Sequence, residues 1–134
     1  MIEDHLTNLE LSKKLEELGE PQVSEFYWIK PSSAQKAFVV DKENLGKRDI
    51  DTLEYVYSAF LASELGEKLP LYLKEDADKG ISFSVEVSGL HIWKTYDGKG
   101  WAVAYGSRTV SADTLPNALA KMRIYLKENN LLKI

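Results

Sequence analysis

The chain of 134 residues contains no cysteine, only two histidines and no long apolar run. The absence of cysteine excludes disulfides, thiol nucleophiles and cysteine-based zinc or iron–sulfur sites. No apolar stretch approaches the roughly 18 residues that a membrane-spanning helix needs. The opening residues Met1 to His5 lack both the basic stretch and the apolar core of a signal peptide. We therefore expect a cytoplasmic protein with no membrane partner.

The chain also has few residues suited to metal or acid–base chemistry. His5 lies near the beginning of the chain and His91 lies in its second half, so nothing in their spacing suggests a shared metal. Gly-x-Ser-x-Gly, a glycine-rich phosphate loop and His-Glu-x-x-His are all missing from the sequence. We therefore expect neither a metal nor another cofactor, and no motif predicts an enzyme.

Charge is distributed unevenly along the chain, whose formal net charge is −4. Residues 1–67 contain 14 acidic and 7 basic side chains, a net charge of −7, whereas residues 68–134 contain 7 acidic and 10 basic ones, a net charge of +3. The overall acidity argues against indiscriminate binding to nucleic acid, although a surface formed by the second half could be locally cationic.

The first half predicts helices and strands in alternation. Thr7 and Glu10 form a capping-box pattern at the start of a first helix, and Gly19 supplies its left-handed end. Two runs rich in aromatic and β-branched residues, 23–30 and 37–40, predict a strand pair. Residues 41–49 predict an exposed loop, and the apolar spacing after Asp51 predicts a second helix that Gly66 ends.

Strands dominate the prediction for the second half. Apolar and polar residues alternate over 81–87, and the turn dipeptides Ser88-Gly89 and Asp97-Gly98 separate further strands at 90–96 and 101–110. A last helix begins near Asp113, with Pro116 in its first turn. The fold class is therefore α+β: one domain over residues 1–134, with an antiparallel sheet, a meander in its second half, and about three packed helices.

Three stretches resemble a group of small uncharacterised proteins encoded in bacterial and prophage genomes. The stretches are Leu11 to Trp28, Glu64 to Pro70 and Ala120 to Asn129. The resemblance implies a phage-related or mobile-element protein, and it transfers no activity and no catalytic residue. The chain departs from this resemblance at Lys68 and Arg123, which stand where the resemblance leads us to expect an apolar residue.

The hairpin 90–108 carries the most informative side chains. Strand parity places Leu90, Ile92 and Tyr96 on one face, together with Trp101, Val103 and Tyr105 of the next strand. The opposite face then carries His91, Trp93 and Arg108 above small residues. An indole among small neighbours is either covered by a helix or offered to a partner as a flat apolar platform.

Three functional interpretations of this face remain open beside a fully packed sheet. The first is protein binding through the aromatic sheet face, because Trp, Tyr and Arg often anchor interfaces. The second is a single-stranded nucleic-acid or nucleotide-binding module that also uses Tyr96, in which Trp93 stacks an unpaired base while His91, Lys99 and Arg108 hold phosphates. The third is an enzyme whose site assembles only in three dimensions, with His91 opposite Glu86.

Basic residues gather near the end of the chain, where the last helix is expected. They are Lys121, Arg123, Lys127 and Lys133. The prediction for these side chains is a solvated helix face, with Lys127 complementing the helix dipole.

Overall fold

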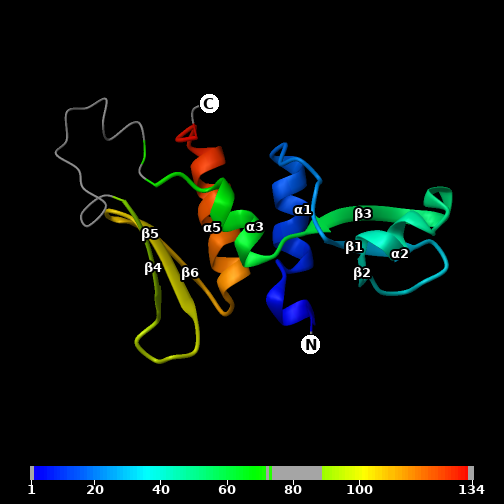
Figure 1. Ribbon diagram of the computed structural model, residues 1–134, viewed down its shortest axis with the longest axis horizontal. Coiled ribbons are helices and arrows are strands. Elements are labelled where there is room, and N and C mark those ends of the chain that lie inside the picture. Colours follow the sequence, from blue (N-terminus) through cyan, green and yellow to red (C-terminus); the bar gives the residue numbers. More distant parts are fainter. Residues whose placement is uncertain (1, 72, 74–88, 133–134) are drawn as a thin grey trace.

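The structure, a computed structural model, describes residues 2–71, 73 and 89–132 (Figure 1). Two three-stranded antiparallel sheets stand at opposite sides, and helices α1, α3 and α5 lie between them. The α+β prediction is confirmed, although the strands divide between two sheets. In the part of the chain that the structure describes, no helix has the length and apolar character to cross a membrane.

The first sheet has the order β2-β1-β3, with β1 at Phe26–Pro31, β2 at Phe38–Asp41 and β3 at Leu53–Ala59. Trp28 in the central strand lies opposite Val39 on one side and Tyr57 on the other. The predicted strand pair is confirmed, because the aromatic and β-branched run of β1 can pack on both faces of a sheet.

The prediction of a helix opening at Asp51 is wrong. Asp51 belongs to a short 3-10 helix, Ile50–Thr52, and the chain then continues as strand β3. The run Tyr55-Val56-Tyr57 strongly favours an extended backbone, and its pairing with β1 outweighs the helical spacing of the apolar residues. A helix, α3 at Ala62–Lys68, begins only after β3, and Gly66 lies inside it.

The predicted loop at 41–49 contains a short helix instead, α2 at Lys42–Gly46. The Asp41 carboxylate accepts a hydrogen bond of 2.7 Å from the Asn44 N–H and so caps the first turn. The local cap explains why this charged segment, which lacks helical periodicity, still forms a helical turn.

The first helix, α1 at Leu9–Glu17, follows a 3-10 turn at Ile2–His5, labelled η1. Its cap is Asn8 and not Thr7, because Asn8 Oδ1 accepts from the Leu11 N–H at 2.8 Å. Thr7 is buried, and its hydroxyl contacts Ser12 Oγ at 2.7 Å and accepts from the Phe60 N–H at 3.0 Å. Gly19 ends the helix region at φ +84°, as predicted.

The second sheet is the predicted meander, in the order β4-β5-β6. Its strands are β4 at Leu90–Lys94, β5 at Trp101–Tyr105 and β6 at Arg108–Ala112. The predicted strand at 101–110 is thus two strands, separated by a turn in which Gly106 has φ +60°. The predicted strand at 81–87 lies outside the described residues.

The last helix, α5 at Leu115–Glu128, is capped by Thr114 and carries Pro116 in its first turn, as predicted. Its buried residues join side chains from both halves of the chain in one apolar core. That core comprises Leu15, Phe60, Leu65, Leu69, Leu73, Val103, Tyr105, Ala118, Leu119, Ala120, Met122, Ile124 and Leu126. The inner face of the second sheet therefore packs on α5, and this contact fixes which of its side chains face outward.

Candidate functional site

Trp93 lies on the outer face of the second sheet, away from α5. It pairs across the sheet with Ala102, whereas the neighbouring residue Val103 belongs to the core. The indole is 44% exposed, although Ala102 and Ala104 beneath this face are only 4% and 3% exposed. Trp93 is therefore a projecting ring beside a closely packed floor of small residues.

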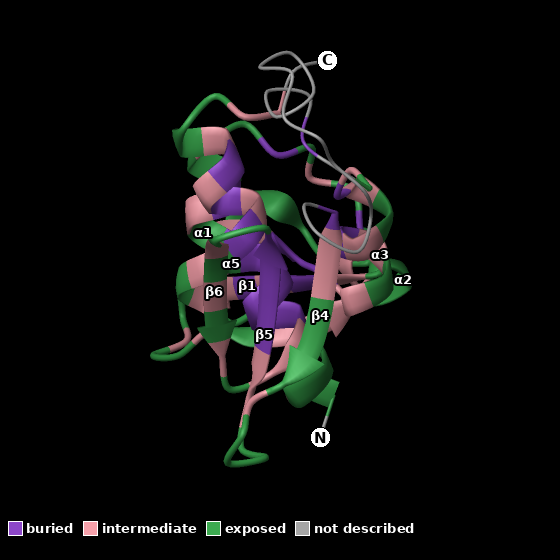
Figure 2. Cartoon of the chain, turned by 90° about the vertical axis from the view of Figure 1, so that its left-hand side faces the viewer, coloured by how far each residue is buried: buried purple, intermediate pink, exposed green. Residues whose placement is uncertain are grey.

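The same outer face continues across the sheet onto β6. His91 lies opposite Ala104, and Thr109 and Ser111 of β6 follow on the other side of the two alanines. Both hydroxyl residues are exposed. In Figure 2, which looks toward this face, the strands stand in front of α5, and no described helix lies over them. The outer face, as we use the term, consists of His91, Trp93, Ala102, Ala104, Thr109 and Ser111.

Arg108 does not belong to the outer face, contrary to the prediction. It pairs with Tyr105, so it shares the face that packs on α5. The cause is the two-residue turn at Gly106 and Ser107, which reverses the chain and breaks the strand parity counted from Trp101. Its guanidinium therefore cannot stand beside Trp93 to hold a phosphate.

Tyr96 and Lys99 lie at the tip of the β4–β5 hairpin. Tyr96 was expected on the buried face, but the chain has already left the strand there and its side chain is fully exposed. Lys99 is exposed in the same turn. The five predicted binding residues thus fall into three places: His91 and Trp93 on the outer face, Tyr96 and Lys99 at the tip, and Arg108 on the inner face.

A carboxylate also occupies the hairpin tip. Asp97 Oδ1 accepts from the Thr95 hydroxyl at 2.6 Å and from the Lys99 N–H at 3.0 Å. These hydrogen bonds, that of Thr95 first, lower the pKa of Asp97 below its ordinary value of 3.8. The tip therefore carries a negative charge in the same turn as Lys99, which makes it a poor phosphate site.

One ring nitrogen of His91, in strand β4, is buried without a described hydrogen-bond partner. That nitrogen is Nε2, and it makes no hydrogen bond among the described residues. Glu86, proposed as its acid–base partner, lies outside those residues, so the structure does not test the pair.

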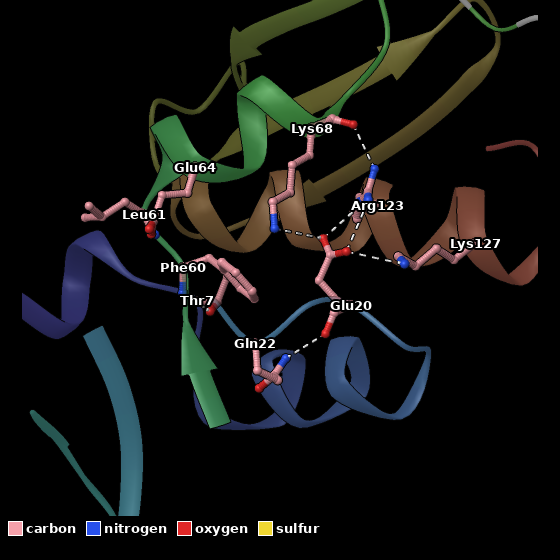
Figure 3. A network of polar contacts seen from close by, with 9 residues as sticks. All are labelled: Thr7, Glu20, Gln22, Phe60, Leu61, Glu64, Lys68, Arg123 and Lys127. Carbon is pink, nitrogen blue, oxygen red and sulfur yellow. Dashed lines mark hydrogen bonds and ion pairs between the residues drawn. The ribbon is translucent and has the colours of Figure 1, made fainter. Parts of the chain in front are cut away.

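A second cluster, around Glu20, has no counterpart in the sequence prediction (Figure 3). The Glu20 side chain is fully buried where the chain leaves α1. Arg123 of α5 donates to it twice, from Nε to Oε1 at 2.9 Å and from Nη2 to Oε2 at 3.1 Å. The remaining guanidinium nitrogen, Nη1, donates to the Lys68 carbonyl at 2.7 Å. Arg123 thereby joins α5 to the end of α3.

Two further cations approach the same carboxylate. Lys68 Nζ lies 3.8 Å from Oε1 and Lys127 Nζ lies 3.3 Å from Oε2. Burial alone raises the pKa of Glu20, but the hydrogen bonds and charge of Arg123, and then the charges of the two lysines, outweigh it. The pKa of Glu20 therefore lies below its ordinary value of 4.5, and the carboxylate stays charged.

The Glu20 cluster corrects the prediction of a solvated basic face on the last helix. Arg123 and Lys127 turn toward a buried carboxylate, whereas Lys121 is exposed. One signal was available in the sequence: Lys68 and Arg123 occupy positions expected to be apolar, and a charge at such a position needs a partner. With every oxygen of Glu20 already engaged, the cluster links elements of the core and offers no open reactive group.

No described group of three histidine, aspartate or glutamate side chains could hold a metal ion. Comparison with protein-family models, with curated proteins and with solved structures gives no match to the chain in any of the three. The functional argument therefore depends on the geometry of the chain itself.

Proposed function

We propose that the protein acts by binding another protein through the outer face of the second sheet, with Trp93 as the anchor. The observation that carries the proposal is the 44% exposure of an indole on the sheet face that α5 does not cover. Tryptophan is the residue type most enriched among interface anchors, since it buries a large area with few rotatable bonds.

The surroundings of Trp93 favour a protein with an apolar, uncharged patch. The floor beneath the outer face consists of Ala102 and Ala104, and exposed hydroxyls at Thr109 and Ser111 form one border. Because the two alanines are almost fully buried, the apolar centre is the Trp93 ring itself, and an apolar centre with a polar, hydrogen-bonding border is the usual anatomy of a protein interface. The matching partner surface presents an aliphatic or aromatic side chain flanked by hydrogen-bonding groups.

The arrangement of cations favours protein over nucleic acid. A single-strand binder needs positive charges that track the backbone next to its stacking rings. Here Arg108 lies on the inner face, and Lys99 shares its turn with the charged Asp97. The Lys94 ammonium lies 5.4 Å from the centre of the Trp101 ring, on the inner face. Among the residues that the structure describes, Arg108, Lys94 and Lys99 therefore do not form a row of cations beside Trp93, as the nucleic-acid alternative requires.

The test compares Trp93→Ala with a control that removes an even more exposed apolar side chain elsewhere. Ile50→Ala is the matched control, because Ile50 is 71% exposed and lies near the first sheet. Proteins captured by the wild-type chain are identified, purified and titrated calorimetrically against each variant. We expect Trp93→Ala to weaken binding about tenfold or more, as loss of an interface anchor does, and Ile50→Ala to leave it unchanged.

A second variant tests whether the partner contacts the rest of the outer face as well as the Trp93 ring. Thr109→Arg adds a bulky charge to the exposed border of the outer face and should also abolish binding while preserving the thermal unfolding midpoint. Equal binding by all variants would refute the proposal. So would tight, steeply salt-dependent binding of fluorescent single-stranded DNA or RNA that Trp93→Ala removes, since that result assigns the ring to nucleic acid.

A further inference from the structure

A pocket opens at the far side of the first sheet, where the edge strand β2 meets the short helix α2. Its volume is about 590 Å³, which falls within the roughly 300 to 1,000 Å³ of small-molecule sites. The lining residues come from η1, β1, β2, α2 and the turn after α2. They are Ile2, Phe26, Val39, Val40, Asp41, Asn44, Lys47 and Arg48.

The lining divides into an apolar and a polar part. Ile2, Phe26 and the two valines of β2 supply hydrocarbon and one aromatic ring. The polar groups all belong to the stretch from Asp41 to Arg48, which runs from the cap of α2 to the turn after it. A ligand that fills the pocket therefore meets apolar walls along one part and charged groups along the other.

Two adjacent cations dominate the polar part, in a half of the chain that is otherwise acidic. The central carbon of the Arg48 guanidinium lies over the Phe38 ring, 5.1 Å from its centre, which is a cation–π contact. Lys47 contacts Glu43 at 3.7 Å through side chains that are both largely exposed, and such a pair is weak and easily exchanged. The lining carboxylate, Asp41, is already engaged by the Asn44 N–H.

We propose that this pocket binds a small apolar carboxylic acid, with its hydrocarbon against Phe26 and the β2 valines and its carboxylate at Arg48 and Lys47. A guanidinium matches a carboxylate through two parallel N–H donors along its edge, and the Phe38 ring beside the Arg48 guanidinium offers no carboxylate or carbonyl oxygen to occupy those donors. The lining carries two cations and one carboxylate, Asp41, while Glu43 pairs with Lys47 from outside the lining. That exposed pair is weak, so the carboxylate of a ligand can replace Glu43 beside Lys47. This site is separate from the outer face of the second sheet.

The test is a titration followed by amide shifts of the isotope-labelled chain. The probes are octanoate, the uncharged octanamide of the same shape, and inorganic phosphate, all at constant ionic strength. We expect octanoate to shift the amides of Val39, Val40 and Asn44 saturably, with a dissociation constant of about 1 mM or tighter. Octanamide should bind about tenfold more weakly, because it lacks the charge, and phosphate should cause no saturable shift.

Two variants decide whether the cations hold the head group. Arg48→Gln should weaken octanoate about tenfold and leave octanamide unchanged, and Lys47→Gln should have a smaller effect in the same direction. Lys47 is highly exposed, so its variant retains the fold even if Arg48→Gln does not. The proposal is overturned if octanoate gives no saturable shift, if octanamide binds equally well, or if both variants bind octanoate like the wild type.

Discussion

At the scale of single residues, the partners of a charged side chain show whether it holds the fold together or is open to a ligand. Glu20 and Arg123 are 103 positions apart in sequence, yet their side chains meet in a bidentate pair inside the molecule. No local pattern in the sequence could show that contact, and only the unexpected charges at Lys68 and Arg123 hinted at it. The position of Trp93, in contrast, follows from a local pattern: the alternation of residues along the strand predicts that it lies on the sheet face opposite Leu90 and Ile92.

Replacing the buried carboxylate of Glu20 should strongly destabilise the fold. Glu20→Gln keeps the shape but leaves the charges of Arg123, Lys68 and Lys127 without their shared anion. We expect the free energy of unfolding to fall by about 3 kcal/mol, as when one partner of a buried pair is removed. Urea unfolding followed by circular dichroism measures the change. Glu128→Gln, which alters only the half-exposed pair with Lys14, should change stability by less than about 1 kcal/mol.

The lowered pKa of Glu20 predicts a specific acid sensitivity. In the unfolded chain this carboxyl takes up a proton near its ordinary pKa of 4.5, whereas in the folded chain it does so only at lower pH. The stability it contributes is therefore fully present above about pH 5 and is lost as the pH falls through the folded-state pKa. The difference in unfolding free energy between wild type and Glu20→Gln should shrink from pH 7 to pH 3. A constant difference would exclude a contribution from this charge.

At the scale of helices and strands, the sequence predicted those elements whose signals agree with one another. The β4–β5 hairpin, α5 and the strand pair of the first sheet each combine periodicity with the appropriate turn or cap residues. The prediction failed at strand β3 because its apolar residues fit both a helical stripe and a strand packed on two faces. Pairing with β1 decides between the two. Arg108 was misplaced because a turn at Gly106, unrecognised in the sequence, changes the parity of β6.

Replacing Gly66 and Gly100 with alanine should change the stability of the fold in opposite directions. A Cβ at Gly66, inside α3, meets no atom within 4 Å, whereas a Cβ at Gly100, beside the β4–β5 turn, would lie 2.6 Å from the Ala112 carbonyl oxygen. We expect Gly66→Ala to stabilise the fold by about 0.5 to 1 kcal/mol, because alanine restricts the unfolded chain. Gly100→Ala should destabilise it by about 1 to 3 kcal/mol through this clash. Thermal unfolding of both variants tests the pair, and equal shifts would contradict the geometry.

At the scale of the whole molecule, contacts between sequence-distant segments hold the two sheets to a shared helical layer. Phe60, directly after β3, belongs to the same apolar core as Val103 and Tyr105 of β5, with Met122 of α5 among them. The Asn8 N–H donates to Asn117 Oδ1 at 2.8 Å, which links the start of α1 to the first turn of α5. These contacts favour the single domain predicted from the sequence over two independent halves.

Cooperative unfolding of the two sheets tests that prediction. Trp28 lies in the first sheet and Trp101 in the second, so variants that retain one tryptophan each report on one sheet. If the shared core couples the sheets, both variants should give the same urea midpoint by fluorescence as by circular dichroism. Met122→Ala, which empties part of that core, should lower the unfolding free energy by about 2 to 5 kcal/mol and move both fluorescence transitions together. Because Met122 is on α5 and fully buried, a transition that moves only for Trp101 would show that the first sheet unfolds independently, and the chain would then consist of two folding units.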